Sequence, residues 1–140
     1  MPDSVFFDTN ILVYAFDKDD PKRQDIAAAL LDENLKLGRA TMSLQVLQEF
    51  FVVTTSKIKS PLTPAMARAL VCDFLHHRVV EPSAVHLLKA IDISMAHRLS
   101  FWDGLILAAA SEAGCRYLYS DDLQHGAKLA GVEIINPFKV

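Results

Sequence analysis

The sequence has few of the features that identify membrane proteins or disulfide-bonded proteins. Only two of its 140 residues are cysteines. Cys72 and Cys115 are isolated, without the paired spacing of a metal site, so we expect two buried thiols in a reducing compartment. No apolar run approaches the ~20 residues that span a bilayer, and no basic stretch precedes an apolar one at the N-terminus. These absences predict a cytoplasmic protein without a membrane partner.

Positive charge is also scarce. The chain has 14 lysines and arginines against 17 aspartates and glutamates, which gives a net charge of −3. A protein that simply coats nucleic acid is usually basic, so any contact with nucleic acid has to be local, with cations masking the acidic groups. Five basic residues are candidates for phosphate contacts, although each is more consistent with a solvated surface: Lys57, Lys59, Arg68, Arg98 and Arg116.

What the chain does contain is a regular alternation of apolar strands and helix-period segments, without repeats or linkers. The length fits one domain, residues 1–140. We expect strands at 5–8, 40–43, 78–82, 116–120 and 132–137, and helices at 21–36, 44–57, 64–77, 83–97 and 101–113. Strands joined by helices predict an α/β fold in which helices flank both faces of a parallel central sheet.

Several acidic residues stand where ordinary solvation does not explain them. Asp8 ends the first strand, and Asp121 and Asp122 directly follow the strand at 116–120. Ligands gather at this carboxyl edge of a parallel sheet. Glu49 borders the apolar stripe of one helix, and Asp103 lies in the first turn of another, very apolar one.

Taken singly, each acid has an ordinary explanation. Asp8, Asp121 and Asp122 fit turns, Asp103 fits a helix cap with Ser100, and Glu49 can reach water at the edge of its stripe. Taken together they can meet at one mouth of the sheet. Carboxylates about 4 Å apart repel by on the order of 4 kcal/mol per pair near a protein surface. A divalent cation would offset this repulsion, and an all-oxygen ligand set favours Mg²⁺ or Mn²⁺.

Four stretches, "FFDTNILVYAF", "LQEF", "FWDGLILAAA" and "YLYSDDLQHG", together resemble the PIN domain. The likeness covers the whole chain and is greatest to the short VapC-type toxins of toxin–antitoxin pairs. It implies a single PIN-like domain that hydrolyses RNA phosphodiester bonds with Mg²⁺ or Mn²⁺. It also implies a homodimer and a cognate antitoxin whose C-terminal segment blocks the acidic site.

The resemblance assigns roles to individual residues. Asp8, Glu49 and Asp103 match the first three acids, which hold metal and carry out catalysis. The family pattern favours Asp122 as the fourth acid, and Asp121 stays open as an additional metal ligand. Asn10 and Ser120 match polar positions that orient ligands or waters. The expected chemistry is in-line attack by a water, without a covalent intermediate.

Three alternatives to a toxin remain at this point: a PIN nuclease of RNA processing, a HAD-like phosphatase and a non-catalytic PIN-like binding module. A HAD-like phosphatase requires a second aspartate where this chain has Asn10, and binding modules typically lose acids that this chain keeps. Phe101 and Trp102, which precede the third acid, are expected in the core, although one of them could stack on a base.

Overall fold

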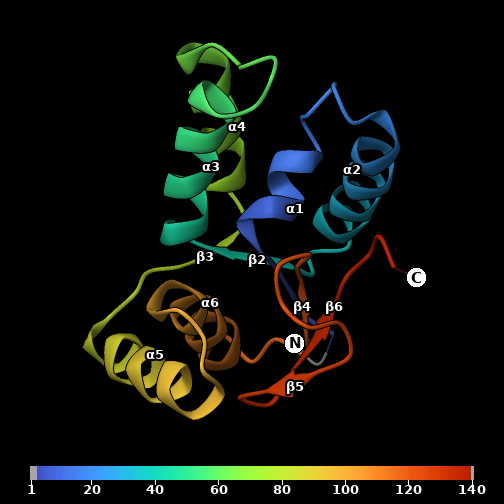
Figure 1. Cartoon of the computed structure of the whole chain (residues 1–140). Helices are drawn as coiled ribbons and strands as arrows, with labels where there is room; N and C mark the ends of the chain where they lie inside the picture. Colours follow the sequence, from blue (N-terminus) through green and yellow to red (C-terminus); the bar gives the residue numbers. More distant parts are fainter. Residues whose placement is uncertain (1–2, 140) are drawn as a thin grey trace.

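The computed structural model describes residues 3–139, whose strands form one six-stranded sheet between two groups of helices (Figure 1). The order across the sheet is β3-β2-β1-β4-β6-β5. The strands are β1 Val5–Phe7, β2 Ala40–Ser43, β3 Arg78–Val80, β4 Tyr117–Tyr119, β5 Lys128–Leu129 and β6 Val132–Ile135. The α/β class expected from the sequence is confirmed.

Six helices in the described residues cover this sheet. They are α1 Thr9–Tyr14, α2 Pro21–Lys36, α3 Leu44–Ser56, α4 Pro64–Phe74, α5 Ala84–His97 and α6 Phe101–Glu112. In Figure 1, α1 to α4 lie above the sheet and α5 and α6 below it, so both faces are covered. None of the helices that the structure describes is long and apolar enough to cross a bilayer.

The middle of the sheet aligns the strands that precede the predicted acids. β1 pairs in parallel with β2 on one side and with β4 on the other, and Phe7 is in register with Tyr119. The residues that follow these two strands therefore leave the sheet side by side. The expectation of a parallel sheet fails only at its far edge, where β5 pairs antiparallel with β6. Ala130 and Gly131, with φ of 52° and 80°, make the tight reversal between them.

The ends of α2 are marked by residues that were predicted from the sequence. Asp20 accepts a hydrogen bond from the backbone N–H of Arg23, and Pro21 occupies the first position of α2. Gly38 follows its end with φ of 67°. The short helix α1 was not expected. Its N-cap is Asp8 itself, whose side chain accepts a hydrogen bond from the backbone N–H of Thr9.

The two cysteines differ in their surroundings. Cys115 is buried, as expected, whereas Cys72 is only partly buried, so the expectation of two buried thiols holds for one of them. Neither is paired in a disulfide within residues 3–139.

A close contact between α5 and α6 fixes the start of α6. A Cβ on Gly104 would lie 2.5 Å from the backbone oxygen of Ala90 on α5, so only glycine fits here. Gly104 directly follows Asp103, so this packing sets where the third predicted acid stands.

Candidate active site

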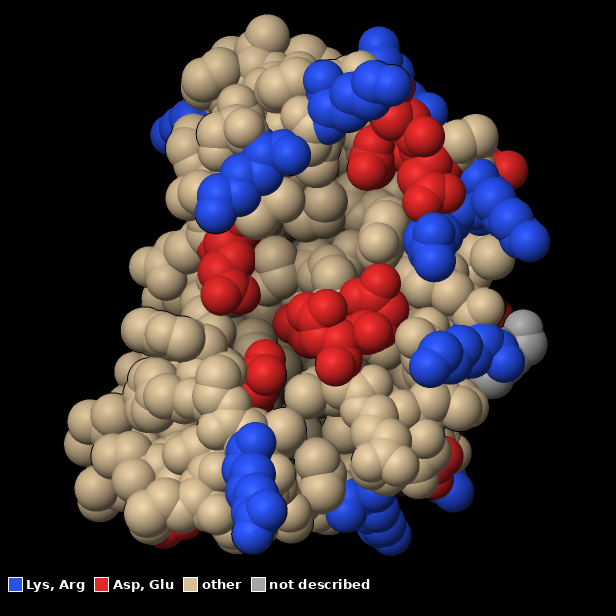
Figure 2. Space-filling view, in the orientation of Figure 1, with Lys and Arg blue, Asp and Glu red and all other residues tan. Residues whose placement is uncertain are grey.

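A cavity of about 700 Å³ opens at the carboxyl edge of the sheet and gathers the predicted acids. Figure 2 shows carboxylates collected in a hollow of this face, with lysines and arginines around its rim. The acids that line the cavity are the five predicted ones, Asp8, Glu49, Asp103, Asp121 and Asp122, together with Asp17. Four separate segments of the chain supply the five, as the sequence led us to expect. Asp17 was not predicted; its carboxylate accepts a hydrogen bond from the backbone of Asp19.

Asp8 is the most deeply placed of these acids, with 6% of its surface exposed. Burial raises the pKa of its carboxyl to about 7, against hydrogen bonds from Ser120 and Thr9 that lower it. The negative charges of Asp122 and Asp103 raise it further. The chain therefore holds, at the centre of the cavity, a carboxylate that is costly to ionise without a counter-charge.

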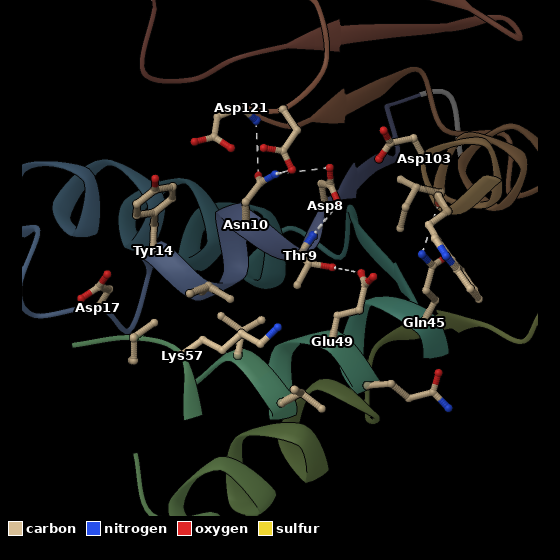
Figure 3. A pocket seen from close by; sticks show the side chains of 18 residues that line it. Asp8, Thr9, Asn10, Tyr14, Asp17, Gln45, Glu49, Lys57, Asp103 and Asp121 are labelled. Atoms are coloured by element: carbon tan, nitrogen blue, oxygen red, sulfur yellow. Dashed lines mark hydrogen bonds between the residues drawn. The ribbon is translucent and has the colours of Figure 1, made fainter. Parts of the chain in front are cut away.

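Glu49 is held by a residue that the sequence analysis did not single out. The hydroxyl of Thr9 donates to Glu49 Oε1 at 2.6 Å, and the backbone N–H of Thr9 donates to Asp8 Oδ1 at 2.7 Å. Thr9 thus links the acid that ends β1 to the acid on α3, as Figure 3 shows. The position is adjacent to Asp8 in "DTN", but nothing in the sequence indicates a partner 40 residues away.

Asn10 and Ser120, predicted to orient ligands, hydrogen-bond to the acids of the cavity. Asn10 Nδ2 donates to Asp122 Oδ2 at 2.8 Å and also lies 3.4 Å from Asp8 Oδ2. Ser120, fully buried, donates to Asp8 Oδ2 at 2.8 Å and accepts from the backbone N–H of Asp122. Two polar side chains therefore join the acids that follow β1 and β4.

Asp121 and Asp122, adjacent in sequence, point to different parts of the cavity. Asp122 is the partner of Asn10 and contributes to the charge around Asp8. Asp121 lies toward Tyr14 in Figure 3, and its backbone N–H donates to Asn10 Oδ1. Burial and the charge of Asp122 raise the pKa of Asp121, while a hydrogen bond with Tyr14 opposes that rise.

Asp103 reaches the cavity from the first turn of α6. Its backbone N–H is capped by the hydroxyl of Ser100 at 3.1 Å, as its place in the sequence suggested. The expectation that Trp102 belongs to the core is wrong, because 60% of its surface is exposed and it lines the cavity. The buried stretch of α6 begins only at Gly104, and Trp102, the second residue of the helix, lies before it. Phe101, by contrast, is half-buried against the core.

A family model matches most of the chain. The PIN domain model matches residues 5–128, which span every acid described above. The chain belongs to the PIN domain family. No curated protein matches the chain.

Solved structures that share this fold include toxins and toxin–antitoxin complexes. VapC20 of Mycobacterium tuberculosis, described as a toxin that cleaves the sarcin–ricin loop, is 19% identical with a TM-score of 0.66, over 84% of this chain and 88% of that one. A toxin–antitoxin complex from Klebsiella pneumoniae is 18% identical with a TM-score of 0.71, covering 96% and 98%. DNA-bound VapBC from Salmonella typhimurium is 17% identical with a TM-score of 0.66, covering 94% and 96%. At these identities the likeness establishes the fold.

Basic residues are sparse inside this PIN-domain cavity. Of the five candidates for phosphate contact, Lys57 lines the cavity, and Arg68 lines a separate apolar hollow between α3 and α4. Lys59, Arg98 and Arg116 are not among the residues that line either one. A cavity with six carboxylates and one ammonium group among its described lining is unsuited to a polyanion unless cations intervene.

The donor set of the cavity suits a hard divalent cation. Within residues 3–139 no three acids, histidines or cysteines stand close enough together to enclose an ion. Several of the acids are instead held by neighbours: Asp8 by Ser120, Glu49 by Thr9 and Asp122 by Asn10. The metal ligands that the cavity offers are carboxylate oxygens. They fit Mg²⁺ or Mn²⁺, which commonly keep several waters between themselves and protein ligands. The buried Asp8 carboxyl, with its pKa near 7, is the group whose ionisation such a cation would favour most.

Proposed function

We propose that this chain is a metal-dependent endoribonuclease that hydrolyses RNA phosphodiester bonds and acts as the toxin of a type II toxin–antitoxin pair. The observation that carries the proposal is the meeting of five carboxylates from four segments around Asp8, whose burial raises its pKa to about 7. Such an arrangement costs stability unless a cation shares it. Membership of the PIN family and the toxin–antitoxin neighbours support the reaction and the role.

Asp8, Asp103 and Asp122 are the residues that would hold the cation, directly or through waters. Bound Mg²⁺ or Mn²⁺ would supply a water of lowered pKa and neutralise charge on the scissile phosphate. Asp8 would release its proton on binding, which burial otherwise disfavours. Asn10 and Ser120 would keep the Asp122 and Asp8 carboxylates oriented through the hydrogen bonds that they donate.

Glu49 stands apart from this group and suits a different task. Its carboxylate is fixed by the Thr9 hydroxyl at 2.6 Å, with its second oxygen left for a water or a further ligand. We assign to Glu49 the positioning of the attacking water and the acceptance of its proton. Attack in line with the leaving oxygen would then cleave the chain in one displacement, without an intermediate bonded to the protein.

The partner proposed for this toxin is an antitoxin that covers the acidic cavity. Beside the cavity, a largely apolar hollow of about 420 Å³ lies between α3 and α4, and Gln48 and Val52 border both. An apolar segment seated there would carry its next residues over the acids. Exposed apolar side chains on α5, including Val85, Leu88 and Met95, offer a surface for the homodimer. The free thiols Cys72 and Cys115 agree with a cytoplasmic setting.

The test of the reaction is cleavage of RNA by the purified chain with Mg²⁺ or Mn²⁺. We expect activity that EDTA abolishes, that added metal restores and that Asp8→Asn removes. Asp92→Asn changes an exposed acid of α5 outside the cavity and is the matched control that should stay active. Activity that persists in EDTA would contradict the metal dependence, and an Asp8→Asn variant as active as the parent would contradict the proposed site.

The toxin role is tested separately in cells. We expect expression of the chain to arrest growth and Asp8→Asn to relieve the arrest, and co-expression of the neighbouring reading frame should relieve it as well. Val52→Arg places a charge at the shared border of the two hollows, so it should weaken rescue by the neighbour. An active nuclease that is harmless and ignores its neighbour would instead indicate a role in RNA processing.

A further inference from the structure

Trp102 is a large, exposed aromatic side chain beside the acids of the cavity. It is 60% exposed, whereas α6 buries every residue from Gly104 to Ala110. It lines the same cavity as Asp8 and Glu49 and precedes Asp103 in the chain. Tryptophan is a costly residue to leave in water, so its place at a catalytic cavity calls for a ligand with a flat apolar face.

The backbone that carries this indole is held on both sides. Gln45, a buried residue of α3, donates from Nε2 to the backbone oxygen of Trp102 at 3.3 Å. The Ser100 hydroxyl accepts from the backbone N–H of Asp103 at 3.1 Å. The ring of Phe101 meets the indole edge-on, with the ring centres 5.0 Å apart. These contacts hold the ring at a set place next to the third acid, which is what a platform for a ligand requires.

The charge of the cavity makes such a platform necessary. Among the described residues that line it, Lys57 is the one basic side chain, against six carboxylates. Apart from bound cations, the cavity therefore offers few groups that attract phosphate, and these can supply little of the affinity for RNA. Stacking of a base on an aromatic ring is independent of charge and tolerates any base, because every base has a flat face.

We propose that Trp102 is the platform on which one base of the RNA stacks while the neighbouring phosphate lies among the acids. This inference rests on the proposed ribonuclease function and adds a base-binding subsite to it. The subsite accepts a single-stranded nucleotide, since the face of a base is open only outside a duplex. Gln45 acts as a positioning residue, because it holds the backbone of the platform and not the base.

The direct test uses the fluorescence of the chain, in which Trp102 is the only tryptophan. The Glu49→Gln variant binds RNA without cleaving it under the proposed mechanism. We expect an octauridylate to quench its tryptophan emission in a saturable titration, and an abasic ribose-phosphate octamer of equal charge to leave the emission unchanged. Emission that depends on protein concentration but not on RNA would mean that Trp102 lies in a protein interface, and would overturn the inference.

Kinetics on variants give a second readout. Trp102→Ala should raise KM about tenfold to a hundredfold, the range of one stacked base, with a smaller effect on kcat. Trp102→Phe should recover most of the loss because it keeps an aromatic face. Leu37→Ala removes an apolar side chain that is 52% exposed at the end of α2 and does not line the cavity, so its KM should match the parent.

The outcomes separate this inference from the proposed function. Cleavage of RNA by the parent without quenching of Glu49→Gln by the octauridylate, or an unchanged KM in Trp102→Ala, overturns the platform and leaves the nuclease standing. Quenching of Glu49→Gln by the octauridylate without cleavage by the parent supports the platform and overturns the nuclease. Absence of both cleavage by the parent and quenching of Glu49→Gln overturns both.

Discussion

Thr9 joins two acids of the cavity through two hydrogen bonds, one from its hydroxyl to Glu49 and one from its backbone N–H to Asp8. The distances are 2.6 Å to Glu49 Oε1 and 2.7 Å to Asp8 Oδ1. Because α1 begins at Thr9, with only Asp8 between it and the end of β1, the helix start sets both contacts at once. The Glu49 side chain on α3 is thus oriented by Thr9, at the start of α1, and not by a residue of its own helix.

The first prediction concerns that hydroxyl. Thr9→Val keeps the shape of the side chain and removes the donor to Glu49, so kcat should fall roughly tenfold to a hundredfold, as expected for one hydrogen bond to a charged group. Thr9→Ser keeps the donor and should retain most of the activity. Steady-state kinetics of RNA cleavage and calorimetric Mn²⁺ titrations check both variants.

Thr55→Val is the control for this pair. Thr55 lies on α3 as Glu49 does, but its hydroxyl donates to the backbone oxygen of Phe51 and it does not line the cavity. Its kinetics should be those of the parent. Equal losses in Thr9→Val and Thr55→Val would show that the loss reflects helix stability and not the orientation of Glu49.

The second prediction follows from the raised pKa of Asp8. The folded chain without metal keeps this carboxyl protonated up to about pH 7, whereas in the unfolded chain it ionises near 3.8. Between these values the folded state binds more protons, so the free energy of unfolding should fall as pH rises from about 4 to about 7. Asp8 alone contributes at most roughly 4 kcal/mol to that fall, taking its shift at face value.

Urea unfolding in EDTA at pH 5 and pH 8 measures this effect. Asp8→Asn cannot ionise, so its free energy of unfolding should change less with pH and should exceed that of the parent at pH 8. Mn²⁺ should stabilise the parent more at pH 8 than at pH 5, because binding has to displace a proton at the lower pH. A parent and an Asp8→Asn variant with the same pH dependence would contradict the proposed burial cost.

The third prediction concerns the contact between α5 and α6. Gly104→Ala puts a methyl group 2.5 Å from the backbone oxygen of Ala90, which a helix cannot move aside cheaply. Alanine favours a helix over glycine by about 1 kcal/mol, yet overpacking costs about 1–3 kcal/mol, so the variant should be less stable in urea. Asp103 precedes this residue, so Mn²⁺ affinity should fall as well.

Gly114→Ala provides the comparison for that variant. It strains a residue with φ of 72° after the other end of α6, where nothing lies within 4 Å of the added group. Stability should fall here too, but the affinity for Mn²⁺ should stay at the parent value. Loss of Mn²⁺ affinity in both variants would show that any weakening of α6 disturbs the cavity.

The sequence predicted the features that depend on residues close together in the chain, such as the ends of helices. Asp20, Pro21 and Gly38 mark the ends of α2 through contacts and backbone angles within a few residues of each other. The meeting of Asp8 with Asp122 was also predictable, because parallel neighbouring strands end at one edge of the sheet. This rule covers the acids that follow β1 and β4, whereas Glu49 and Asp103 lie on the helices α3 and α6.

The remaining features arise from contacts that no local pattern encodes. The Thr9–Glu49 hydrogen bond joins residues 40 positions apart and depends on how α3 packs against α1. Trp102 is a large apolar residue of the kind expected in a core. Its exposure depends on how α6 packs, because Gly104 is the residue that meets α5. The β5–β6 pair is too short for a periodic signal, since β5 has two residues.

The last prediction decides between the two adjacent acids after β4. Asp122 accepts from Asn10 and adds to the charge around Asp8, whereas Asp121 faces Tyr14. Asp122→Asn should therefore lower kcat/KM and Mn²⁺ affinity by on the order of tenfold to a hundredfold, and Asp121→Asn should change both far less. Each substitution keeps the size of the side chain, and the two serve as controls for each other. Equal losses would place both carboxylates on the metal. A larger loss in Asp121→Asn would reverse the assignment, since the carboxylate that Asn10 holds, Asp122, would then not be the metal ligand.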